Sequence, residues 1–476
     1  MTATNITAAD LPTLLAHDIA VKVAGIDCDG IFRGKVMSKD KFIGIAQKGF
    51  GFSSAVFGWD MQDVLYTTDA KISDPKSGYV DFIAVPDLNS FRRIPWEDNI
   101  PFFLVQFMQN GVPVVADGRS MLKGVCERLE AADCQARAGV ELEFMNFQTP
   151  SQEGYDSKTH NLAAFLETNA PAALRPITAG SFSYSATRPV AFKDYFWDIF
   201  NTSAQFDCLI EGWHTEGGPG VYEAALKVSP ALEMADKAAL FKFLAKSIGL
   251  KHGITPCFMA KPIHGQPGSS GHIHISLCSL SSGKNLFARD VQDPDTTYPD
   301  AANLSDLGRH FLAGILSALR DIMPLFAPTI NSYKRLVENY WAPVNISWGL
   351  EDRMASVRLI TPPVCAPTAT RFEVRIPGAD MHPHYALSVL LMAGWRGVEK
   401  KLELSVPPLS AGGEEPQRLP NTLEDAVRRF NAKGSIAREL LGDEFVDFFT
   451  ATREHELRVW REAVTDWEFK RYIETI

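Results

Sequence analysis

The amino-acid sequence predicts an α+β protein made of two domains, a small β-rich domain over residues 1–113 and a larger domain over residues 114–476. A chain of 476 residues is longer than one small hydrophobic core usually serves, which favours two units. Short β-prone runs punctuated by glycine and proline fill the first part, and longer runs of helical periodicity begin soon after residue 113. In the second part, strands carry most of the acidic and histidine pairs and helices flank them, which is typical of an α+β domain.

The first part contains the elements of a small sheet. Residues 8–17 can form a short helix, and the β-prone runs between residues 19 and 36 are separated by Asp27-Cys-Asp-Gly30, a turn sequence typical of hairpins. Residues 48–54 are rich in glycine and are expected to form a loop.

The second part is expected to alternate helices and strands. Its first helix spans residues 120–133, with Ser120 as the N-cap because a serine hydroxyl can accept a hydrogen bond from the first turn. The further expected strands cover residues 140–147, 208–214, 221–228, 272–280 and 371–376. The further expected helices cover residues 193–207, 230–250, 303–321 and 383–402, and a loop at 404–420 leads to a mostly helical tail.

Composition and charge disfavour several classes of protein. Hydrophobic residues make up 46% of the chain and charged residues 22%, as in ordinary globular proteins. The formal net charge of −10 disfavours nucleic acid and anionic membranes as partners. No apolar run approaches the roughly 20 residues of a membrane-spanning helix, and the N-terminus lacks the basic and apolar regions of a signal peptide, so we expect a cytoplasmic protein. The seven cysteines are scattered without a Cys-x-x-Cys pair, which favours reduced, mostly buried thiols.

Two glutamates lie two residues apart on the expected strand 140–147. Side chains alternate between the two faces of a strand, so Glu141 and Glu143 project to one face while Val140 and Leu142 project to the other. Two carboxylates held side by side in this way require a cation to offset their repulsion.

Three further pairs follow the same logic. They are Glu216 and Glu223 about a glycine-rich loop, His272 and His274 on one expected strand, and Glu373 and Arg375 on another. Five carboxylates with one or two imidazoles suit Mg²⁺ or Mn²⁺, and zinc is disfavoured because no cysteine joins the set. Any one of these pairs, taken alone, is more often an exposed strand face or a structural histidine, so the interpretation depends on their occurring together.

Cations are concentrated between residues 331 and 358 of this acidic chain. Arg335, Arg353 and Arg358 are expected to hold anions, namely phosphate groups and a carboxylate. Trp341 lies among them, where a small second substrate is expected to arrive.

Several long motifs in a fixed order resemble those of the glutamine synthetase family. They are Lys261–Leu277, similar to the family's ATP-site segment, followed at the family's spacing by Asn331–Arg335, Ala342–Ile346, Arg353, Arg358 and Arg371–Arg375. The resemblance extends through most of the chain. It implies a small N-terminal β-grasp domain and a large catalytic domain whose curved antiparallel sheet forms a funnel flanked by helices. It also implies a homo-oligomer of stacked rings with each active site between neighbouring subunits.

The resemblance implies a role for each matching position. One metal ion would be held by Glu143, Glu216 and Glu223, and another by Glu141, His272 and Glu373. Nucleotide phosphates would be bound by His274, Arg353 and Arg358, with Ser276 in the same ATP-site segment. Glutamate and the transferred phosphoryl group would be bound by Arg335 and Arg375, and the backbone at Gly268 would approach the amino-acid carboxylate. The implied cofactors are two or more Mg²⁺ or Mn²⁺ ions per site, with ATP as co-substrate.

The implied reaction is that of an ATP-dependent carbon–nitrogen ligase. The γ-carboxylate of glutamate attacks the γ-phosphorus of ATP, and a nitrogen nucleophile then takes the acyl group from the acyl phosphate. Metal ions and arginines would neutralise the charge on the phosphoryl group during its transfer.

Two positions depart from the members of the family that use ammonia. Those members contribute an aspartate to the neighbouring subunit's site, where this chain has Gly51, and they carry a glutamate where it has Trp341. Without these carboxylates an ammonium ion is poorly held. An aromatic residue there resembles the branch that joins glutamate to polyamines, monoamines or ethanolamine, and its cation–π contact with an amine would be worth roughly 0.5–2 kcal/mol. The alternative is that Trp341 only fills the vacated volume.

Other differences lie elsewhere in the motifs. Val221 replaces a glutamine, Pro267 replaces an asparagine before Gly268, and Thr368 also differs from common family forms. Residues 381–384 differ as well and could form the start of a helix.

Three functions are therefore weighed from the sequence. The first is a γ-glutamyl–amine ligase, the second an ammonia-dependent glutamine synthetase, and the third a catalytically inactive ring-forming structural or regulatory relative. Retention of the six expected metal ligands and of the site arginines disfavours the third, and the loss of both ammonium-binding carboxylates disfavours the second. The identity of the amine does not follow from the sequence.

Overall fold

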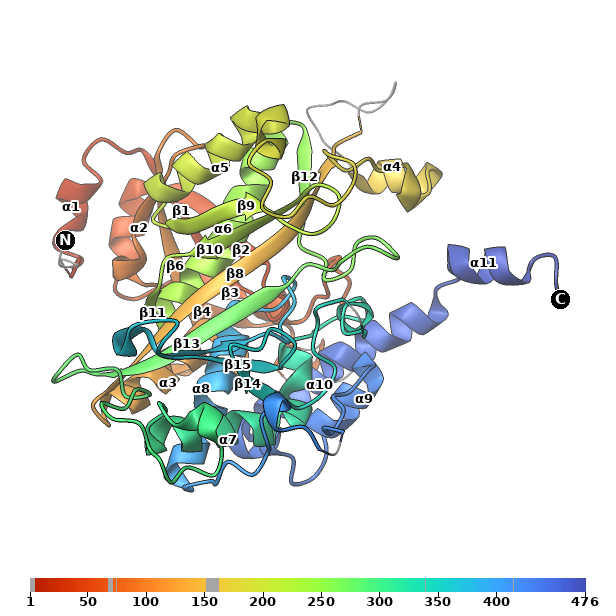
Figure 1. Ribbon diagram of the computed structural model, residues 1–476. Helices are drawn as coiled ribbons and strands as arrows, with labels where there is room; N and C mark the ends of the chain where they lie inside the picture. Colours follow the sequence, from red (N-terminus) through yellow and green to blue (C-terminus); the bar gives the residue numbers. More distant parts are fainter. Residues whose placement is uncertain (1–4, 67–71, 74, 151–161, 339, 414) are drawn as a thin grey trace.

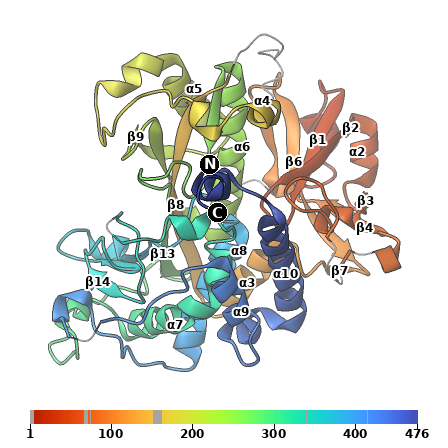
Figure 2. The same ribbon diagram turned by 90° about the vertical axis from the view of Figure 1, so that its right-hand side faces the viewer.

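The computed structural model describes residues 5–66, 72–73, 75–150, 162–338, 340–413 and 415–476. These residues form two sheets with helices between and around them, which confirms the α+β class (Figure 1). Figure 2 shows the N-terminal sheet on one side of the molecule and the larger sheet on the other. Between the sheets lie helices α3 (Gly118–Glu130), α6 (Ala231–Lys251) and α8 (Pro383–Glu399).

The N-terminal sheet has seven strands within the described part of the chain. Their order is β2–β1–β6–β4–β3, with β5 and β7 also paired to β6, and only β1 and β6 run parallel. The strands are β1 (Ala20–Ile26), β2 (Phe32–Ser38), β3 (Phe50–Ser53), β4 (Asp81–Pro86), β5 (Arg92–Ile94), β6 (Ile100–Gln109) and β7 (Val112–Pro113). Helix α1 (Leu11–Leu14) precedes them and α2 (Lys39–Ile45) follows β2.

The hairpin expected at residues 27–30 is present between β1 and β2. The Asp27 carboxylate accepts hydrogen bonds from the backbone N–H groups of Asp29 and Ile31, at 3.0 and 2.9 Å. Gly30 has a φ of +80°, a conformation that glycine adopts without steric cost. The turn chemistry in the sequence therefore determines the local geometry.

The expectation of a loop over residues 48–54 is wrong, because Phe50–Ser53 forms strand β3 against β4. Gly49 has a φ of +73°, and a Cβ atom there would lie 2.7 Å from the carbonyl oxygen of Ala84. Glycine thus allows the chain to approach β4 closely where β3 begins.

Helix α3 begins two residues earlier than the sequence indicated, and its N-cap is Asp117 rather than Ser120. The buried Asp117 carboxylate accepts hydrogen bonds from the Ser120 hydroxyl at 2.5 Å and from the backbone N–H of Phe107 at 3.1 Å. Ser120 therefore binds the capping residue instead of being it.

The larger sheet has nine strands within the described residues. Their order is β14–β15–β16–β13–β8–β10–β9, with β11 and β12 paired to β8, and only β14 and β15 run parallel. The strands are β8 (Cys134–Gln148), β9 (Ile210–Thr215), β10 (Val221–Leu226), β11 (Ser229–Pro230), β12 (Ile254–Cys257), β13 (Gly271–Ser279), β14 (Trp348–Leu350), β15 (Val357–Ile360) and β16 (Arg371–Val374). Each strand expected in this part of the chain is present.

One face of the long strand β8 is apolar and packs against helices. Val140, Leu142 and Phe144 are buried, and α3 and α6 lie against this strand. Helix α6 also packs against the N-terminal domain. The ring centroid of its Phe243 lies 5.4 Å from that of Trp96 and 5.7 Å from that of Phe32. The opposite face of β8, which carries Glu141 and Glu143, is left for the site.

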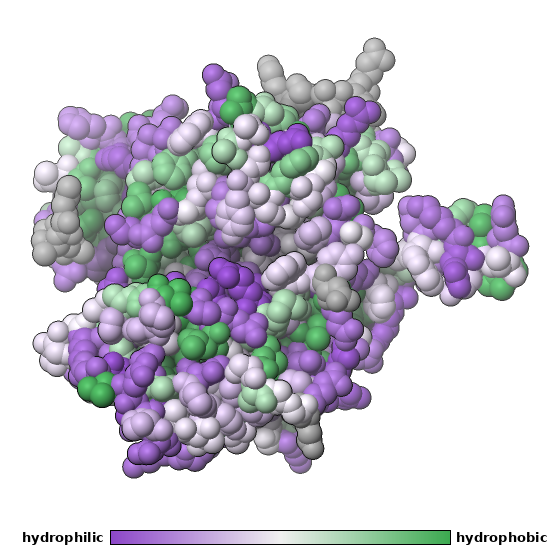
Figure 3. Space-filling model, viewed as in Figure 1, coloured by the Kyte–Doolittle hydropathy of each residue, from purple (hydrophilic) through white to green (hydrophobic). Residues whose placement is uncertain are grey.

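The remaining helices are α4 (Leu162–Thr168), α5 (Lys193–Gln205), α7 (Asp306–Ile322), α9 (Leu423–Phe430), α10 (Ile436–Glu462) and α11 (Asp466–Tyr472). They lie at both ends of the larger sheet in Figure 1, with α4 and α5 in the upper part of the view and α7, α9 and α10 in the lower part. Helix α11 projects away from the body and exposes Trp467 and Phe469 (Figures 1 and 3). His382 caps α8 by accepting a hydrogen bond from the backbone N–H of Tyr385, so residues 381–384 do form a helix start.

Two expectations from the sequence concern the whole chain: that no helix spans a membrane, and that the cysteines are reduced and mostly buried. Among the described helices, none has both the length and the apolar character needed to cross a lipid bilayer. All seven cysteines are free, but only Cys28, Cys134 and Cys208 are fully buried.

Candidate active site

The sequence-predicted site residues meet in a cavity of about 770 Å³ on the polar face of the larger sheet. All of them line this cavity except His274, Ser276 and Gly51. Figure 3 shows a hollow lined by hydrophilic side chains in the middle of the face over which β8 and β13 run. Side chains from five strands, β8, β10, β13, β15 and β16, and from the loops beside them are thus brought to one place.

The strand register explains why the charged residues lie side by side. Glu143 of β8 is directly opposite Glu223 of β10, and Glu223 is opposite His214 of β9. On the other side of β8, Glu141 is opposite His272 of β13. A second row joins neighbouring strands, in which His274 is opposite Glu373 and Glu373 is opposite Arg358. Because facing residues on adjacent strands have Cβ atoms about 5 Å apart, these rows place their carboxylates and imidazoles within reach of a shared ion.

The first cluster is formed by Glu141, Glu373 and two histidines. The Glu141 carboxylate lies 3.3 Å from Nδ1 of His272 and 3.0 Å from Nε2 of His274. Nδ1 of His272 is also 3.5 Å from Glu373. Burial alone would raise the pKa of Glu141, but its contacts with His272 and His274 hold it well below the usual range. Glu141, His274 and Glu373 present donor atoms within 4.8 Å of one another, an arrangement that can hold a metal ion.

The second cluster is formed by His214, Glu216 and Glu223, again with donor atoms within 4.8 Å of one another. Nε2 of His214 is 3.6 Å from Glu223, and its Nδ1 is 4.0 Å from Glu216. Burial and the neighbouring carboxylates of Glu143 and Glu141 raise the pKa of Glu223 to about 10. A divalent cation would remove this repulsion, and the oxygen-rich donor set fits Mg²⁺ or Mn²⁺.

Glu143 lies between the two clusters. Its carboxylate accepts a 2.6 Å hydrogen bond from the backbone N–H of Ser270, while Glu143 also lies directly opposite Glu223. His214, which joins Glu216 and Glu223 in the second cluster, was missed by the sequence reasoning. A signal for it was present, since His214 and Glu216 have the same spacing of two on a strand as Glu141 and Glu143.

The four arginines of the site differ in their partners. Arg358 pairs with Glu373 at 2.9 Å and also with Glu351, which does not line the cavity, and Arg375 pairs with Glu373 as well. Arg335 has no carboxylate within ion-pair distance, and Arg353 has neither an ion pair nor a hydrogen bond, among the residues that the structure describes. The last two therefore remain available to anionic ligands.

The loop before β13 brings backbone close to Arg335. A Cβ atom on Gly268 would lie 2.8 Å from Cγ of Arg335 and 2.4 Å from the carbonyl oxygen of Ala260, so only glycine fits. Pro267 also lines the cavity.

Aromatic residues form the mouth of the cavity. Trp341 is 67% exposed and has a φ of +58°, and beside it the ring of Tyr340 lies 4.1 Å from Nζ of Lys261. Tyr184 also lines the cavity, and its ring packs against that of His214 in a tilted arrangement with centroids 4.4 Å apart. Nothing in the local sequence pattern distinguishes Tyr184 from an ordinary loop tyrosine, so it could not have been found in advance.

Three sequence-predicted positions lie outside the cavity of this subunit. Nδ1 of His274 accepts a 3.1 Å hydrogen bond from Arg371, and Ser276 lies two residues farther along the same strand, opposite Arg137. Gly51 lies on β3 in the N-terminal sheet, where a Cβ atom would meet the Asp81 carboxylate at 2.4 Å.

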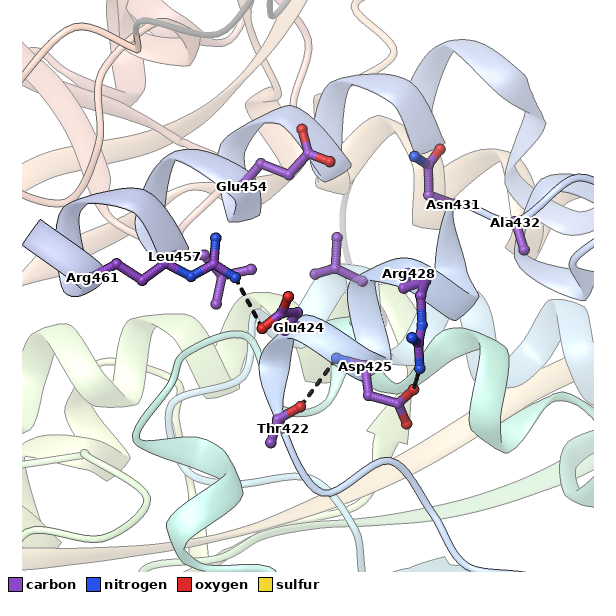
Figure 4. A pocket seen from close by; sticks show the side chains of 10 residues that line it. Thr422, Glu424, Asp425, Arg428, Asn431, Ala432, Glu454, Leu457 and Arg461 are labelled. Atoms are coloured by element: carbon purple, nitrogen blue, oxygen red, sulfur yellow. Dashed lines mark hydrogen bonds and ion pairs between the residues drawn. The ribbon is translucent and has the colours of Figure 1, made fainter.

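Another cavity, of about 840 Å³, lies between α9 and α10 (Figure 4). Both of its arginines pair with carboxylates of the same cavity, Arg461 with Glu424 at 2.9 Å and Arg428 with Asp425 at 2.5 Å. It contains none of the sequence-predicted residues, and its arginines are already neutralised.

Comparison with known proteins agrees with this geometry. A family model described as glutamine synthetase, catalytic domain, matches residues 115–472. The chain is 40% identical over 463 residues to Type-1 glutamine synthetase 2 of Dictyostelium discoideum, covering 96% of this chain and 84% of that protein. It is 32% identical over 467 residues to the glutamate–isopropylamine ligase of a Pseudomonas species, covering 97% and 96%. A solved structure titled GmaS/ADP complex shares the fold, with a TM-score of 0.78, 24% identity and coverage of 98% and 99%.

Members of the matching family use ATP and divalent metal ions, and the two acidic clusters provide suitable donor sets. The family match covers well over half of the chain, and the relatives align along nearly its whole length. The chain therefore belongs to the glutamine synthetase family, and it is an ATP-dependent carbon–nitrogen ligase of the glutamine synthetase type.

Proposed function

We propose that this chain is a γ-glutamyl–amine synthetase, which activates the γ-carboxylate of glutamate as an acyl phosphate and transfers the glutamyl group to a primary amine. The observation that carries the proposal is the placement of Trp341 at the mouth of the acidic cavity. A residue that only filled vacated volume would be buried by its neighbours, whereas two thirds of Trp341 is exposed within this subunit. The name of the Pseudomonas relative, an amine ligase, gives further support.

In this proposal the charged residues have separate roles in phosphoryl transfer. Glu143, Glu216 and Glu223 hold one divalent ion, with His214 beside them, and Glu141, His272 and Glu373 hold another. When bound, the ions would neutralise charge on the phosphates of ATP and on the glutamate carboxylate.

Arg335 and Arg353, which lack carboxylate partners in the described part of the chain, bind the anionic oxygens of the substrates. Arg375 orients the phosphoryl group from the opposite side, and Arg358, His274 and Ser276 act toward the nucleotide. Backbone at Gly268 approaches the amino-acid carboxylate beside Arg335. The unprotonated amine nitrogen then attacks the acyl carbon, and phosphate leaves with the bonding electrons and takes up the proton that the nitrogen loses.

A second candidate is an ammonia-dependent glutamine synthetase, and one observation favours it. The carboxylate of Asp81 lies where a side chain on Gly51 would begin, so an acid remains next to the position that lacks one. The Dictyostelium relative is named a glutamine synthetase. An inactive structural relative is disfavoured. Burying Glu223 among other carboxylates lowers the stability of the fold, and a protein with only a structural role would gain no function in return.

We further propose that the chain works in the cytoplasm as a homo-oligomer of stacked rings, with residues 1–113 and 114–476 as its domains and each site between subunits. Exposed apolar residues support subunit contacts at two places, Ile83 and Val112 on the N-terminal sheet and Trp467 and Phe469 on the projecting α11. The net charge of −10 supports small-molecule substrates over nucleic acid or membranes.

ATP-dependent phosphate release with glutamate and a panel of amines tests the proposed function. We expect phosphate to be released faster with at least one primary alkylamine than with ammonium, when both are compared at equal concentrations of the unprotonated base. Release that is fastest with ammonium would favour the second candidate. No release with any nucleophile, together with no metal-dependent binding of ATP, would contradict both.

The variant Trp341→Glu is expected to shift the preference from amine toward ammonium. It restores a carboxylate at the mouth and removes the aromatic surface, and loss of a cation–π contact of roughly 1 kcal/mol corresponds to about a fivefold change in kcat/KM. The conservative variant Trp341→Phe keeps a ring and serves as the control. An unchanged ratio of amine to ammonium turnover in Trp341→Glu would remove Trp341 from the acceptor site.

A further inference from the structure

A smaller cavity adjoins the active-site cavity at Tyr184. It has a volume of about 350 Å³, within the range of roughly 300–1,000 Å³ that is typical of ligand pockets. Aromatic and aliphatic side chains line most of it, including Val190, Phe196, Trp197 and Trp213. Tyr184 lines both cavities and therefore lies between them. We refer to the smaller one as the side cavity.

Hydrogen bonds hold Tyr184 firmly in place between the two cavities. Its backbone N–H donates to the carbonyl oxygen of Thr215 at 2.7 Å, and the N–H of Ser185 donates to the Thr215 hydroxyl at 3.0 Å. The Thr215 hydroxyl in turn donates to the carbonyl oxygen of Phe182 at 2.7 Å. Thr215 lies next to Glu216, so the segment 182–185 is fixed directly to the strand that carries the acidic cluster.

The backbone of Tyr184 adopts an unfavourable conformation, and the side chain is too exposed for hydrophobic burial to offset the energetic cost. Its φ of +53° lies in the left-handed region, which costs a non-glycine residue about 1 kcal/mol or more. Yet 71% of Tyr184 is exposed. Trp341 across the mouth shows the same combination of a positive φ and high exposure. Two large aromatic residues presented in this way to one cavity are expected to contact a ligand.

The charges around the side cavity are unlike those of the active-site cavity. None of the described residues that line it is acidic, Lys193 supplies its one permanently charged side chain, and His214, which contacts Glu223, also lines it. Arg188 lies close by, with its guanidinium 3.6 Å from the centre of the Phe182 ring. Trp197 is 53% exposed, so its indole face is available to an apolar group. The side cavity therefore attracts apolar groups and repels cations.

We propose that the side cavity binds the substituent of the acceptor amine, and that this substituent is apolar and uncharged, as in an arylalkyl or branched alkyl monoamine. The inference rests on the proposed function and narrows its substrate class. The amino group lies in the acidic cavity near Glu216, and the carbon chain passes Tyr184 to reach Trp197. A diamine is disfavoured because its second ammonium group would lie near Lys193 without a carboxylate to pair with.

The variant Trp197→Ala tests the apolar contact. The KM for phenethylamine is expected to rise about tenfold, because a hydrophobic contact of this size discriminates by roughly one order of magnitude, while the KM for ethylamine stays within about twofold. Neither kcat should change, because the reacting nitrogen is placed elsewhere. Trp460→Ala, which removes a half-exposed tryptophan from α10, is the matched control and should leave both KM values unchanged.

The variant Lys193→Glu tests the charge. With butylamine and 1,4-diaminobutane as a pair of similar length, the ratio of their kcat/KM values is expected to move toward the diamine by about tenfold, since one repulsive charge becomes attractive. The exposed Lys433, on the loop between α9 and α10, provides the control variant Lys433→Glu, which should leave the ratio unchanged.

The outcomes separate this inference from the proposed function. If wild-type enzyme uses ammonium but no amine, the proposed function fails and the inference fails with it. If amines are substrates but Trp197→Ala affects phenethylamine and ethylamine equally, the inference alone is overturned. A wild-type preference for 1,4-diaminobutane over butylamine would overturn it as well.

Discussion

The variant Glu373→Ala is expected to lose ATP-dependent phosphoryl transfer almost completely. Glu373 is only 1% exposed, and its carboxylate contacts Arg358, Arg375 and His272. Removing it would take away a ligand of the first acidic cluster, leave Arg375 without its carboxylate partner and leave Arg358 paired with Glu351 alone. Loss of a preorganised charged group at a reacting centre typically lowers kcat by about 10²–10³-fold or more.

The same substitution also removes a buried charge, so stability must be measured separately from activity. Leaving one member of a buried ion pair alone costs roughly 3–5 kcal/mol. The neutral variant Glu373→Gln keeps the volume and the hydrogen-bonding shape and should unfold at a temperature closer to that of the wild type. It is nevertheless expected to lose activity as severely, because the charge is what the proposed role requires.

Glu351→Gln provides a matched control for the charge effect. Glu351 also pairs with Arg358, but it belongs to neither acidic cluster. We expect this variant to retain metal-dependent ADP formation within about tenfold of the wild type, because only one arginine loses one partner. Near-normal ADP formation in Glu373→Gln, with Mn²⁺ affinity unchanged by calorimetry, would contradict the assignment of Glu373 to a metal site.

The strand-borne part of the site could be predicted from the sequence because side-chain alternation is a local property. Glu141 with Glu143, His272 with His274, and Glu373 with Arg375 each share a face at a spacing of two, and the resemblance to a known family ordered these pairs along the chain. The same rule applied to His214 and Glu216 would have found His214. It was missed because only the acidic member of that pair belonged to a motif that the resemblance singled out.

Other features depend on contacts that the sequence does not display. Strand β3 was expected to be a loop because glycine usually marks one, but Gly49 serves close packing against Ala84. Helix α3 starts at Gly118, after Asp117, whose carboxylate also binds the backbone of Phe107 in the N-terminal sheet. The exposure and positive φ of Trp341, and the placement of Tyr184 next to the acidic cluster, depend on loops whose conformation is set by partners far away in the sequence.

The variant Arg335→Lys is expected to lower kcat by about 10²–10³-fold even though it keeps the positive charge, because a lysine cannot reproduce paired guanidinium contacts. The Arg335 side chain is 5% exposed, and it donates hydrogen bonds to the carbonyl oxygens of Ile376 at 2.8 Å and Arg375 at 3.1 Å. These bonds fix the planar group while leaving its charge without a carboxylate partner in the described part of the chain.

Electrostatics indicate what that charge is for. Burial lowers the pKa of Arg335 to about 10 even though Glu143 and Asp380 raise it, so the protein holds this cation at a cost. An anionic substrate offsets this energetic cost only if it contacts the guanidinium group of Arg335 in the cavity. Arg335 is therefore expected to act on the carboxylate of glutamate or on the phosphoryl group in transfer, and the loss should appear in ADP formation before any amine is added.

Arg320→Lys is the matched control for this change. Arg320 lies on α7, makes no ion pair among the described residues and does not line the acidic cavity, so its exchange should leave kcat within about twofold of the wild type. Thermal unfolding should show that both variants remain folded, since each keeps a cation of similar length. If Arg335→Lys forms ADP at the wild-type rate, the two backbone hydrogen bonds serve only to pack the loop, and the anion must be held by Arg353 and the metal ions instead.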